Sequence, residues 1–364
     1  MISKTSFPPR ILVIGAGAAG LAFALACAHR GVRVEIIDKR PARSLIQKAT
    51  GVAQGVWRQL APFGITASII HDAFPMRRFV FHDDGRLVAD VPVPSIDGQP
   101  PAHLYPQGEL EKFMEDCLHQ RGVTVEYGAS FVSVSEADGV ARVRIARETG
   151  GIEEIDVDWL IGADGVHSDV RTQLQIPFVG RDYPEDWSVA EISTAQWPEH
   201  VHAQLFLGSD GVGLFLSRPT KGIVQGILNG VGAAGALTTH FPDATLHYER
   251  NFKVSLRRVE TPRRGRTWLV GDAAHAQSPV GGQGLNLAIW DGITLANALL
   301  DGDLSVERRL AWRARRVLFF TDFDYRMLAT RSKPVRMLRN LYWAGSARRP
   351  FLAHWFFKVI SGVW

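Results

Sequence analysis

The sequence predicts an α/β protein in which a parallel-sheet domain is interleaved with a mixed or antiparallel sheet domain and followed by C-terminal helices. Near the start of the chain and again far downstream, strand-like apolar runs lead into glycine-rich loops and helices, as in βαβ units. Between about residues 177 and 261, short runs typical of antiparallel strands replace this pattern. The length of 364 residues is enough for two such domains.

The composition is that of a folded globular protein. Hydrophobic residues make up 46% of the chain and charged residues 21%, which excludes a disordered chain and a multi-span membrane protein. Cys27 and Cys117 are the only cysteines, too few for a disulfide framework or a cysteine-built zinc site. The histidines lack HExxH spacing, so we expect no metal. With no targeting signal recognised, we expect a cytoplasmic protein.

The first motif occupies residues 10–38. An apolar strand leads into Gly15-Ala-Gly17-Ala-Ala-Gly20, a helix follows to His29, and a second strand closes on Asp38. The glycines of such a motif allow a tight turn, close approach of a pyrophosphate, and close packing of helix on strand, while the terminal carboxylate grips a ribose hydroxyl. The pattern predicts a dinucleotide site that includes Gly15, Gly17, Ala18, Ala19, Gly20, Asp38 and Lys39.

Another motif rich in glycine and acid lies at residues 266–286. A strand ends in Gly271-Asp272, and a glycine-rich loop over 278–286 leads into a helix that we expect over 287–300. A carboxylate at a strand end can hold a sugar-alcohol hydroxyl, and amides at a helix start can face an anionic group. Between the two motifs, Asp164-Gly165 again follows a strand, and Ser168 is placed to cap a helix.

Taken in chain order, the motif at residues 10–38, the one at Asp164-Gly165 and the one at Gly271-Asp272 resemble the three motifs of the FAD-dependent aromatic hydroxylases, the single-component flavoprotein monooxygenases of the p-hydroxybenzoate hydroxylase type. The resemblance covers roughly residues 10–300. It implies a Rossmann-like FAD-binding domain in which the first motif holds the ADP part of FAD and Asp272 holds the ribityl chain. Asp164 and Gly165 would serve FAD and NAD(P)H. The resemblance also places these residues beside the flavin ring: Pro279, Gly282, Gly284, Leu285 and Asn286.

Two residues outside the three motifs are also assigned by the resemblance. Gln107, at the start of a helix expected to run to His119, matches a glutamine or arginine that contacts FAD. Lys48 falls near an arginine that contacts phosphate, but residues 43–51 depart from the usual pattern, and a solvated lysine is the alternative. Asp38 stands where the family usually has Glu followed by Arg, a difference that keeps the carboxylate.

The sheet over 177–261 is expected to be joined by a hairpin over 77–105, with Asp84-Gly85 as its turn. The resemblance implies that this sheet roofs the substrate pocket and brings Ser217 and Arg218 near it; a surface arginine is the alternative. We therefore expect an FAD-binding domain over 8–76, 106–176 and 262–300, a substrate domain over 77–105 and 177–261, and a C-terminal helical region over 301–364.

The C-terminal region has an unusual charge. Residues 325–364 contain eight Lys and Arg and no Asp or Glu. The net charge of the whole chain is +4, so residues 1–324 have a net charge of −4. Apolar residues from Phe351 to Ile360 recur at helical spacing. This pattern suits a helix packed on the flavin domain with a wet basic face, or a peripheral helix on an anionic membrane surface. Nothing resembles a nucleic-acid-binding module, so we expect no such partner.

The resemblance implies a monooxygenase that uses FAD, NADPH or NADH, and O2 to hydroxylate an aromatic or other hydrophobic small molecule through a flavin C4a-hydroperoxide. A flavin-dependent halogenase, a reductase of the same fold and a non-catalytic flavin-binding partner stay open as alternatives. The Trp-x-Trp-x-Ile-Pro signature expected of a halogenase is not found in the sequence. No pattern identifies a catalytic acid or base. Ser217, Arg218 and Pro279 are the candidates for the substrate pocket.

Overall fold

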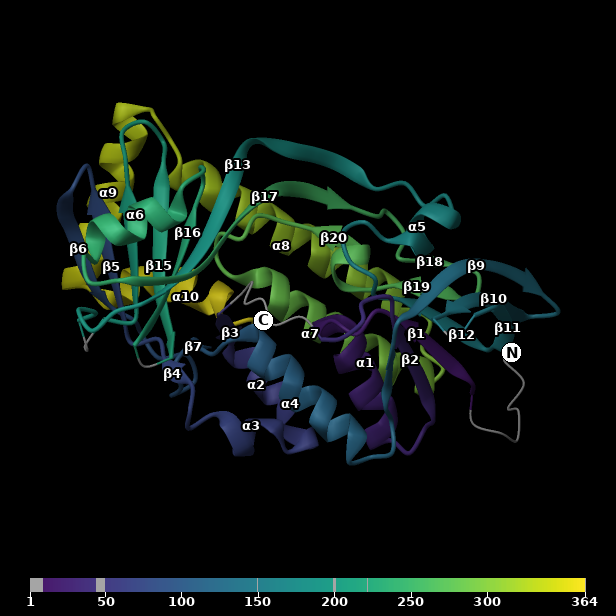
Figure 1. The fold of residues 1–364 in the computed structure, drawn as a ribbon. Helices are drawn as coiled ribbons and strands as arrows, with labels where there is room; N and C mark the ends of the chain where they lie inside the picture. The colour runs from purple at the N-terminus through teal and green to yellow at the C-terminus, as the bar shows by residue number, and fades with distance from the viewer. Residues whose placement is uncertain (1–8, 44–49, 149, 199–200, 221, 364) are drawn as a thin grey trace.

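The computed structural model describes residues 9–43, 50–148, 150–198, 201–220 and 222–363. A six-stranded sheet and an eight-stranded sheet lie toward opposite ends of the molecule, right and left in Figure 1, with long helices running between them. The α/β fold with mixed sheets and C-terminal helices is as predicted.

The six-stranded sheet has the order β18-β19-β12-β1-β2-β8, and all its neighbours pair in parallel except β18 with β19. Both faces are covered, which suits the continuous apolar sequence of its central strands. The strands are β1 (Ile11–Ile14), β2 (Val34–Asp38), β8 (Val125–Tyr127), β12 (Trp159–Gly162), β18 (Arg263–Arg264) and β19 (Thr267–Leu269).

Successive residues of β1 point to opposite faces of this sheet. Ile11 and Val13 pack in one core with the helices α1 (Ala18–His29), α4 (Gln107–His119) and α7 (Gln283–Leu300). Leu12 and Ile14 pack in a second core against a three-stranded antiparallel sheet. Its strands are β9 (Ala129–Ala137), β10 (Val140–Arg147) and β11 (Ile152–Val157).

The eight-stranded sheet has the order β20-β17-β13-β16-β15-β14-β5-β6 and is antiparallel except where β14 pairs with β5. The expected hairpin is confirmed, because Asp84 and Gly85 both have positive φ (47° and 73°) between β5 and β6. The strands are β5 (Arg78–Asp83), β6 (Arg86–Pro92), β13 (Val179–Ser193), β14 (Ala203–Leu207), β15 (Gly213–Thr220), β16 (Ile223–Leu228), β17 (Thr245–Arg258) and β20 (His275–Ala276).

Short elements connect the two sheets. The strands β3 (Gly51–Ala53), β4 (Phe74–Pro75) and β7 (Ala102–Leu104) form a small antiparallel sheet in the order β3-β7-β4. The helices α2 (Gln54–Leu60), η1 (Ala61–Phe63) and α3 (Ile65–Ile69) follow β3 directly. This small sheet lies beside the N-terminal end of α7, and it contributes to the site described below.

Different helices cover the two faces of the eight-stranded sheet. Helix α6 (Ala233–His240) packs on one face, and α9 (Lys333–Arg348) and α10 (His354–Ile360) place Trp343 and Phe357 in the core of the other. Helix α8 (Val306–Leu328) runs between the two sheets, and η3 (Pro350–Ala353) joins α9 to α10. The chain end returns to the middle of the molecule beside β3 and α7 (Figure 1).

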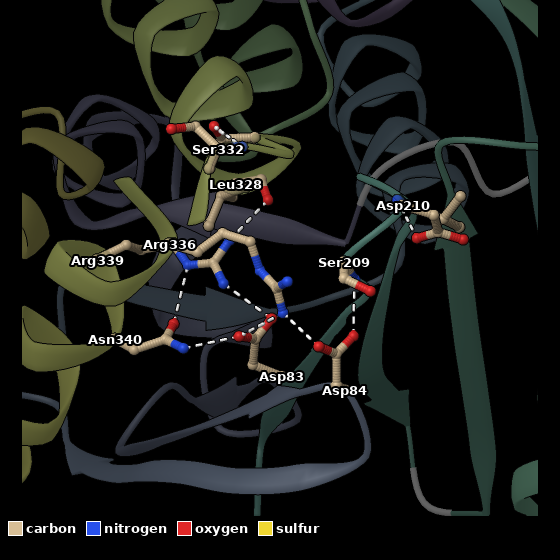
Figure 2. A network of polar contacts seen from close by, with 11 residues as sticks. Asp83, Asp84, Ser209, Asp210, Leu328, Ser332, Arg336, Arg339 and Asn340 are labelled. Atoms are coloured by element: carbon tan, nitrogen blue, oxygen red, sulfur yellow. Dashed lines mark hydrogen bonds and ion pairs between the residues drawn. The ribbon is translucent and has the colours of Figure 1, made fainter. Parts of the chain in front are cut away.

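Buried charges anchor α9 to the β5–β6 hairpin (Figure 2). Asp83 accepts hydrogen bonds from Arg339 Nη2 at 2.9 Å, Arg336 Nη2 at 2.8 Å and Asn340 Nδ2 at 2.7 Å. Asp83 and Arg339 are both buried, so their ion pair compensates each charge for the loss of its hydration. The network holds the C-terminal region on the eight-stranded sheet.

Three helix boundaries differ from the sequence prediction. Helix α7 begins at Gln283 rather than Leu287, because Gly282 takes a left-handed conformation (φ 61°) at the N-cap position. Helix α1 begins at Ala18, inside the glycine motif, rather than after Gly20. The apolar run over 351–360 is a 3₁₀ turn followed by a short α-helix, rather than one continuous helix.

Candidate functional site

The loop after β1 shows a separate steric role for each glycine of the first motif. A Cβ on Gly15, whose φ is +104°, would lie 2.4 Å from the carbonyl oxygen of Ala163. A Cβ on Gly20 would lie 2.0 Å from the carbonyl oxygen of Gly15. A Cβ on Gly17 would meet no atom within 4 Å. Gly15 and Gly20 therefore serve the fold, whereas Gly17 leaves space at the start of α1.

Asp38 closes β2 beneath this loop. The carboxylate accepts hydrogen bonds from the Ala16 amide at 2.8 Å and from Arg40, whose Nη2 lies 2.7 Å from Oδ2 and whose Nε lies 2.9 Å from Oδ1. Burial opposes the charged form, but the hydrogen bonds from Arg40 and Ala16 outweigh it and lower the pKa of Asp38. Arg40 was not predicted, because only the folded loop brings it onto the carboxylate.

Helix α4 adds a second acid to the start of α1. Glu111 Oε1 accepts hydrogen bonds from the Ala18 amide at 3.1 Å and from Gln107 Nε2 at 2.7 Å. A negative charge at this point interacts favourably with the α1 dipole. The structure thus brings Gln107 to the first motif, and its contact with FAD stays a prediction. Glu111 was missed, although its spacing of four residues from Gln107 is a usable signal.

The second motif is built around Asp164. Its Oδ2 accepts the amides of Asp169 and Val170 at 2.8 and 3.1 Å and so caps α5 (Asp169–Gln173), while Ser168 Oγ accepts the Arg171 amide at 2.9 Å. Its Oδ1 is buried without a hydrogen-bond partner in the described ranges, and burial raises the pKa of Asp164. This orphaned acceptor lies one residue from Ala163, which contacts the first motif.

Arg171 joins the second motif to the third. Its guanidinium is buried, stacks 3.9 Å from the ring centroid of Phe178, and donates to the carbonyl oxygens of Ala273 at 2.8 Å and Val166 at 2.7 Å. Lys39 reaches the same helix through an exposed ion pair with Asp169 (2.9 Å). The sequence did not indicate either contact.

The third motif packs directly on the first. Gly271 has φ +59°, and a Cβ there would lie 2.8 Å from Cβ of Ala19 on α1. The motif folds as the 3₁₀ turn η2 (Gly271–Ala273), in which Asp272 is exposed at the surface. Asp272 therefore follows directly after a residue that packs on the first turn of α1.

His275 has a structural role next to this turn. Its Nε2 lies 2.5 Å from Oδ2 of Asp291, which also accepts the Gly271 amide at 3.3 Å, and both side chains are buried. Burial alone would lower the pKa of His275, but the carboxylate of Asp291 raises it. The pair holds η2 against α7.

Hydrogen bonds fix both the loop before α7 and the first turn of this helix. Pro279 accepts the Gly282 amide at 3.0 Å. The Asn286 side chain accepts the Ala53 amide at 2.7 Å through Oδ1 and donates from Nδ2 to the Gly51 carbonyl oxygen at 3.0 Å. The Asn286 side chain therefore ties α7 to β3, and the helix start is left with its first-turn amides as donors.

Ser217 connects the eight-stranded sheet to this region. The Ser217 hydroxyl is buried on β15 and lies 3.1 Å from Thr50 Oγ1, the residue before β3. Arg218 lies on the same strand, but its side chain is outside the described part of the structure. Lys48 also lies outside the described residues.

One buried acid beside the loop was not predicted. Asp324 on α8 is 8% exposed, and its Oδ2 has no hydrogen-bond partner among the described residues. That oxygen lies 3.9 Å from the position that a Cβ on Gly281 would take. Burial raises the pKa of Asp324 to about 7. A single Asp within a helix carries no sequence signal of such a role.

The three motifs meet at the carboxyl edge of the six-stranded sheet, where β1, β12 and β19 end. Ligands bind at such edges in open α/β sheets. The open space at Gly17, the orphaned Asp164 Oδ1, the exposed Asp272 and the amides at the starts of α1 and α7 fit a long ligand with phosphates and hydroxyls. In the described ranges, no cluster of His, Cys, Asp or Glu suited to a metal ion is present.

Comparison with known proteins identifies a ligand of this kind. A family model described as "FAD binding domain" matches residues 9–229 and 233–303. The 6-methylpretetramide 4-monooxygenase of Streptomyces rimosus is 26% identical over 80% of this chain and 56% of its own length. The pentachlorophenol 4-monooxygenase of Sphingobium chlorophenolicum is 27% identical over 78% and 57%. The chain thus spans somewhat more than half of these relatives.

Solved structures show the same fold. The crystal structure of a p-nitrophenol 4-monooxygenase from Pseudomonas putida aligns with a TM-score of 0.84 at 19% identity and covers 98% of this chain and 99% of its own. A flavin-dependent monooxygenase solved with FAD and substrate aligns with a TM-score of 0.75 over 94% of this chain. Since the family model covers more than half of the chain, the protein belongs to the FAD-binding-domain family of FAD-dependent aromatic hydroxylases.

Proposed function

We propose that this protein is a monooxygenase that uses FAD, NADPH or NADH, and O2 to hydroxylate an aromatic or other hydrophobic small molecule. The observation that carries the proposal is the meeting of three motifs at one sheet edge. A mixed sheet lies close by, since its Ser217 contacts Thr50, the residue before the strand β3 that Asn286 ties to α7. The relatives are named for 6-methylpretetramide and pentachlorophenol, which favours a phenolic ring as the substrate here.

In this proposal, three groups of residues hold FAD. The pyrophosphate binds at the loop of Gly15, Gly17 and Gly20 and at the α1 amides. Asp38 binds the ribose hydroxyls through the same carboxylate that accepts hydrogen bonds from Arg40. Asp272 takes the ribityl chain. The first-turn amides of α7 take the flavin ring edge. Residues 8–76, 106–176 and 262–300 form the part that binds FAD, and 77–105 and 177–261 form the part over the substrate.

The bound flavin would supply the redox chemistry, which passes electrons from the nicotinamide to O2 and one oxygen atom to the substrate. The protein's own contribution is electrostatic and steric. The positive end of the α7 dipole and its amides stabilise negative charge at the ring edge, without reorganisation at the moment of reaction. The eight-stranded sheet, with Ser217 buried on β15, would keep water away from the bound substrate.

Asp324 is the group in this region suited to hold a proton near neutral pH. Its carboxyl lies beside Gly281, two residues from Pro279, and no described side chain neutralises it. A phenolic substrate that loses its proton becomes a better donor of electrons to the incoming oxygen. We propose that Asp324 Oδ2 accepts that proton, directly or through water.

We also propose that the reaction takes place in the cytoplasm, because the two cysteines are both buried as thiols and do not pair. Among the described residues, no helix has the length and apolar content needed to cross a membrane.

The test is turnover by the FAD-loaded protein with a panel of phenols, quinone precursors and N-heterocycles. NADPH or NADH consumption, peroxide and product mass are measured together. We expect one class of compound to accelerate consumption and to gain one oxygen atom with little peroxide. Halide-dependent chlorination would indicate a halogenase. A reduced product without added oxygen would indicate a reductase, and bound flavin that NAD(P)H never reduces would indicate a non-catalytic partner.

A further inference from the structure

Large exposed apolar side chains concentrate on the C-terminal helices. Elsewhere in the described chain the exposed members are isolated Val, Leu and Ile residues, whereas those on α8, α9, η3 and α10 are mostly aromatic. We call the following set the aromatic face: Phe319, Phe323, Leu338, Leu341, Tyr342, Phe351, Leu352 and Trp355. Several are exposed by more than three fifths, including Phe319 at 75% and Phe351 at 69%.

Contacts link the elements that carry this face. The Tyr342 hydroxyl donates to the Leu352 carbonyl oxygen at 3.2 Å, which joins α9 to η3. The ring of Trp355 lies 6.2 Å from that of Phe320, which joins α10 to α8. Phe319 and Phe323 stack one turn apart at 6.5 Å. Within α9, Leu338, Leu341 and Tyr342 recur at intervals of three and four and so share one side.

Five basic residues of the region matter for this face and fall into two groups. Arg336 and Arg339 form ion pairs with Asp83 and hold α9 in place (Figure 2). Arg348, Arg349 and Lys358 are exposed on either side of Phe351 and Trp355, and no ion pair with described residues engages them. No Asp or Glu occurs after residue 324, so the part of the aromatic face on α9, η3 and α10 is flanked by basic side chains alone from these elements.

We propose that the aromatic face docks onto the surface of an anionic lipid bilayer. Aromatic and leucine side chains insert at the boundary between headgroups and acyl chains, while Arg348, Arg349 and Lys358 meet anionic headgroups. A second copy of this chain fits less well, because a symmetric contact would bring these like charges together. Nucleic acid would match the charge and leave the Leu and Phe side chains unpaired. The docking stands apart from the proposed function.

The aromatic face lies close to the candidate site. Phe320 contacts Trp355 on one side, and on the other its Cε1 lies 3.5 Å from the position of a Cβ on Gly281. One aromatic side chain thus separates the face from the loop before α7. A lipophilic substrate dissolved in the bilayer would arrive beside this loop, a consequence that rests on the proposed function.

Deletion of the chain end would be a poor test, because α10 is part of the fold. Ala353 and Phe357 are fully buried, the Gly55 amide donates to the Ser361 carbonyl oxygen at 2.8 Å, and Gln283 Nε2 donates to that of Ile360 at 3.3 Å. Substitution of exposed side chains leaves these contacts intact and separates docking from folding.

The experiment is flotation of the full FAD-loaded chain with two kinds of vesicle, phosphatidylcholine alone and phosphatidylcholine mixed with phosphatidylglycerol. Two variants change the face, Phe351→Ser with Trp355→Ser, and Arg348→Glu with Arg349→Glu. The matched control is Leu87→Ser with Val231→Ser, since both residues are 63% exposed away from the face. Thermal midpoint and flavin content confirm that each variant folds, and light scattering reports the oligomeric state.

We expect the wild type and the control to float with anionic vesicles, and each face variant to bind at least about tenfold more weakly. Flotation with neutral vesicles should be marginal. No binding of the wild type to anionic vesicles would overturn the proposal, as would equal losses in the control. A dimer that only the face variants dissociate would identify a second copy as the occupant and would overturn it as well.

Discussion

Arg171 Nη1 lies 2.8 Å from the carbonyl oxygen of Ala273, and this hydrogen bond joins two motifs that the sequence separates by about a hundred residues. The same guanidinium donates to Val166 in the loop after Asp164. The relative position of Asp164 and Asp272 therefore depends on a buried side chain between the motifs. The first prediction concerns this link.

Arg171→Met should destabilise the protein by about 2–4 kcal/mol and weaken FAD retention, because two buried carbonyl oxygens lose a charged donor. Urea unfolding and flavin content after gel filtration measure the two effects. Lys253→Ala is the control, since its exposed ion pair with Asp186 lies outside the candidate site and contributes below about 1 kcal/mol. Equal behaviour of the two variants would remove Arg171 from this role.

Gly17 and Gly20 should separate ligand binding from folding. Gly17→Ala adds a methyl group into open space at φ −88°, so the apoprotein should lose less than about 1 kcal/mol. Its FAD affinity should fall at least about tenfold, because the methyl group lies where a phosphate approaches the backbone. Gly20→Ala overlaps the Gly15 carbonyl oxygen and should cost about 3 kcal/mol or more. FAD titration and thermal melts of both apoproteins provide the measurements, and unchanged FAD affinity in Gly17→Ala would contradict the assigned phosphate position.

Asp272→Ala should weaken FAD binding about tenfold with little change in the stability of the apoprotein, because the carboxylate is exposed and serves the ligand. Flavin content on purification and a fluorescence titration measure the affinity. Asp301→Ala, another exposed acid just beyond the end of α7, is the control and should retain FAD. Full flavin content in Asp272→Ala would refute its place at the ribityl chain.

The stability of the protein should depend on pH through Asp324. Its pKa rises from 3.8 in an ordinary setting to about 7 in the fold, so the folded state holds a proton that the unfolded chain releases. The contribution of Asp324 to the free energy of unfolding is therefore greatest below pH 3.8. It falls by up to about 4 kcal/mol as the pH rises to about 7. Asp324→Asn removes the ionisation, so the loss of stability between about pH 5 and about pH 8 should shrink. Identical pH profiles of unfolding in the two proteins would show that Asp324 does not titrate there.

Asp83→Ala should destabilise the C-terminal region strongly. Arg339 would be left buried without its partner, and breaking such a pair by removing one member costs about 3–5 kcal/mol. Asp84→Ala is the control, because Asp84 is far more exposed and its loss leaves the pair of Asp83 with Arg339 intact. Proteolysis within α9 and the thermal midpoint should distinguish the two variants. A melting curve of Asp83→Ala that matches the wild type would contradict the anchoring role.

The motifs were predictable because their chemistry is local. Gly20 answers a steric demand set by Gly15 within the same turn, and the alternating runs of β14 and β15 follow directly from the strand period. The roles of these residues toward FAD remain predictions that the experiments above address.

The contacts that the sequence did not indicate join distant parts of the chain. Glu111 and Ala18 are 93 residues apart, and Arg339 and Asp83 are 256 apart, with no periodicity to connect them. Asp324 gains its character from burial, which a single residue type does not reveal. The start of α7 was misplaced because the left-handed conformation of Gly282 lets a helix begin where a glycine-rich loop was expected.

The most direct test of the proposed activity is a single turnover under isotopically labelled O2. The FAD-loaded protein is mixed with NADPH or NADH and the phenol that best accelerates its consumption, and the product is analysed by mass spectrometry. We predict that the product carries one labelled oxygen atom and that the yield matches the NAD(P)H consumed. Unlabelled oxygen in the product, or consumption that yields only peroxide with every substrate, would contradict monooxygenation.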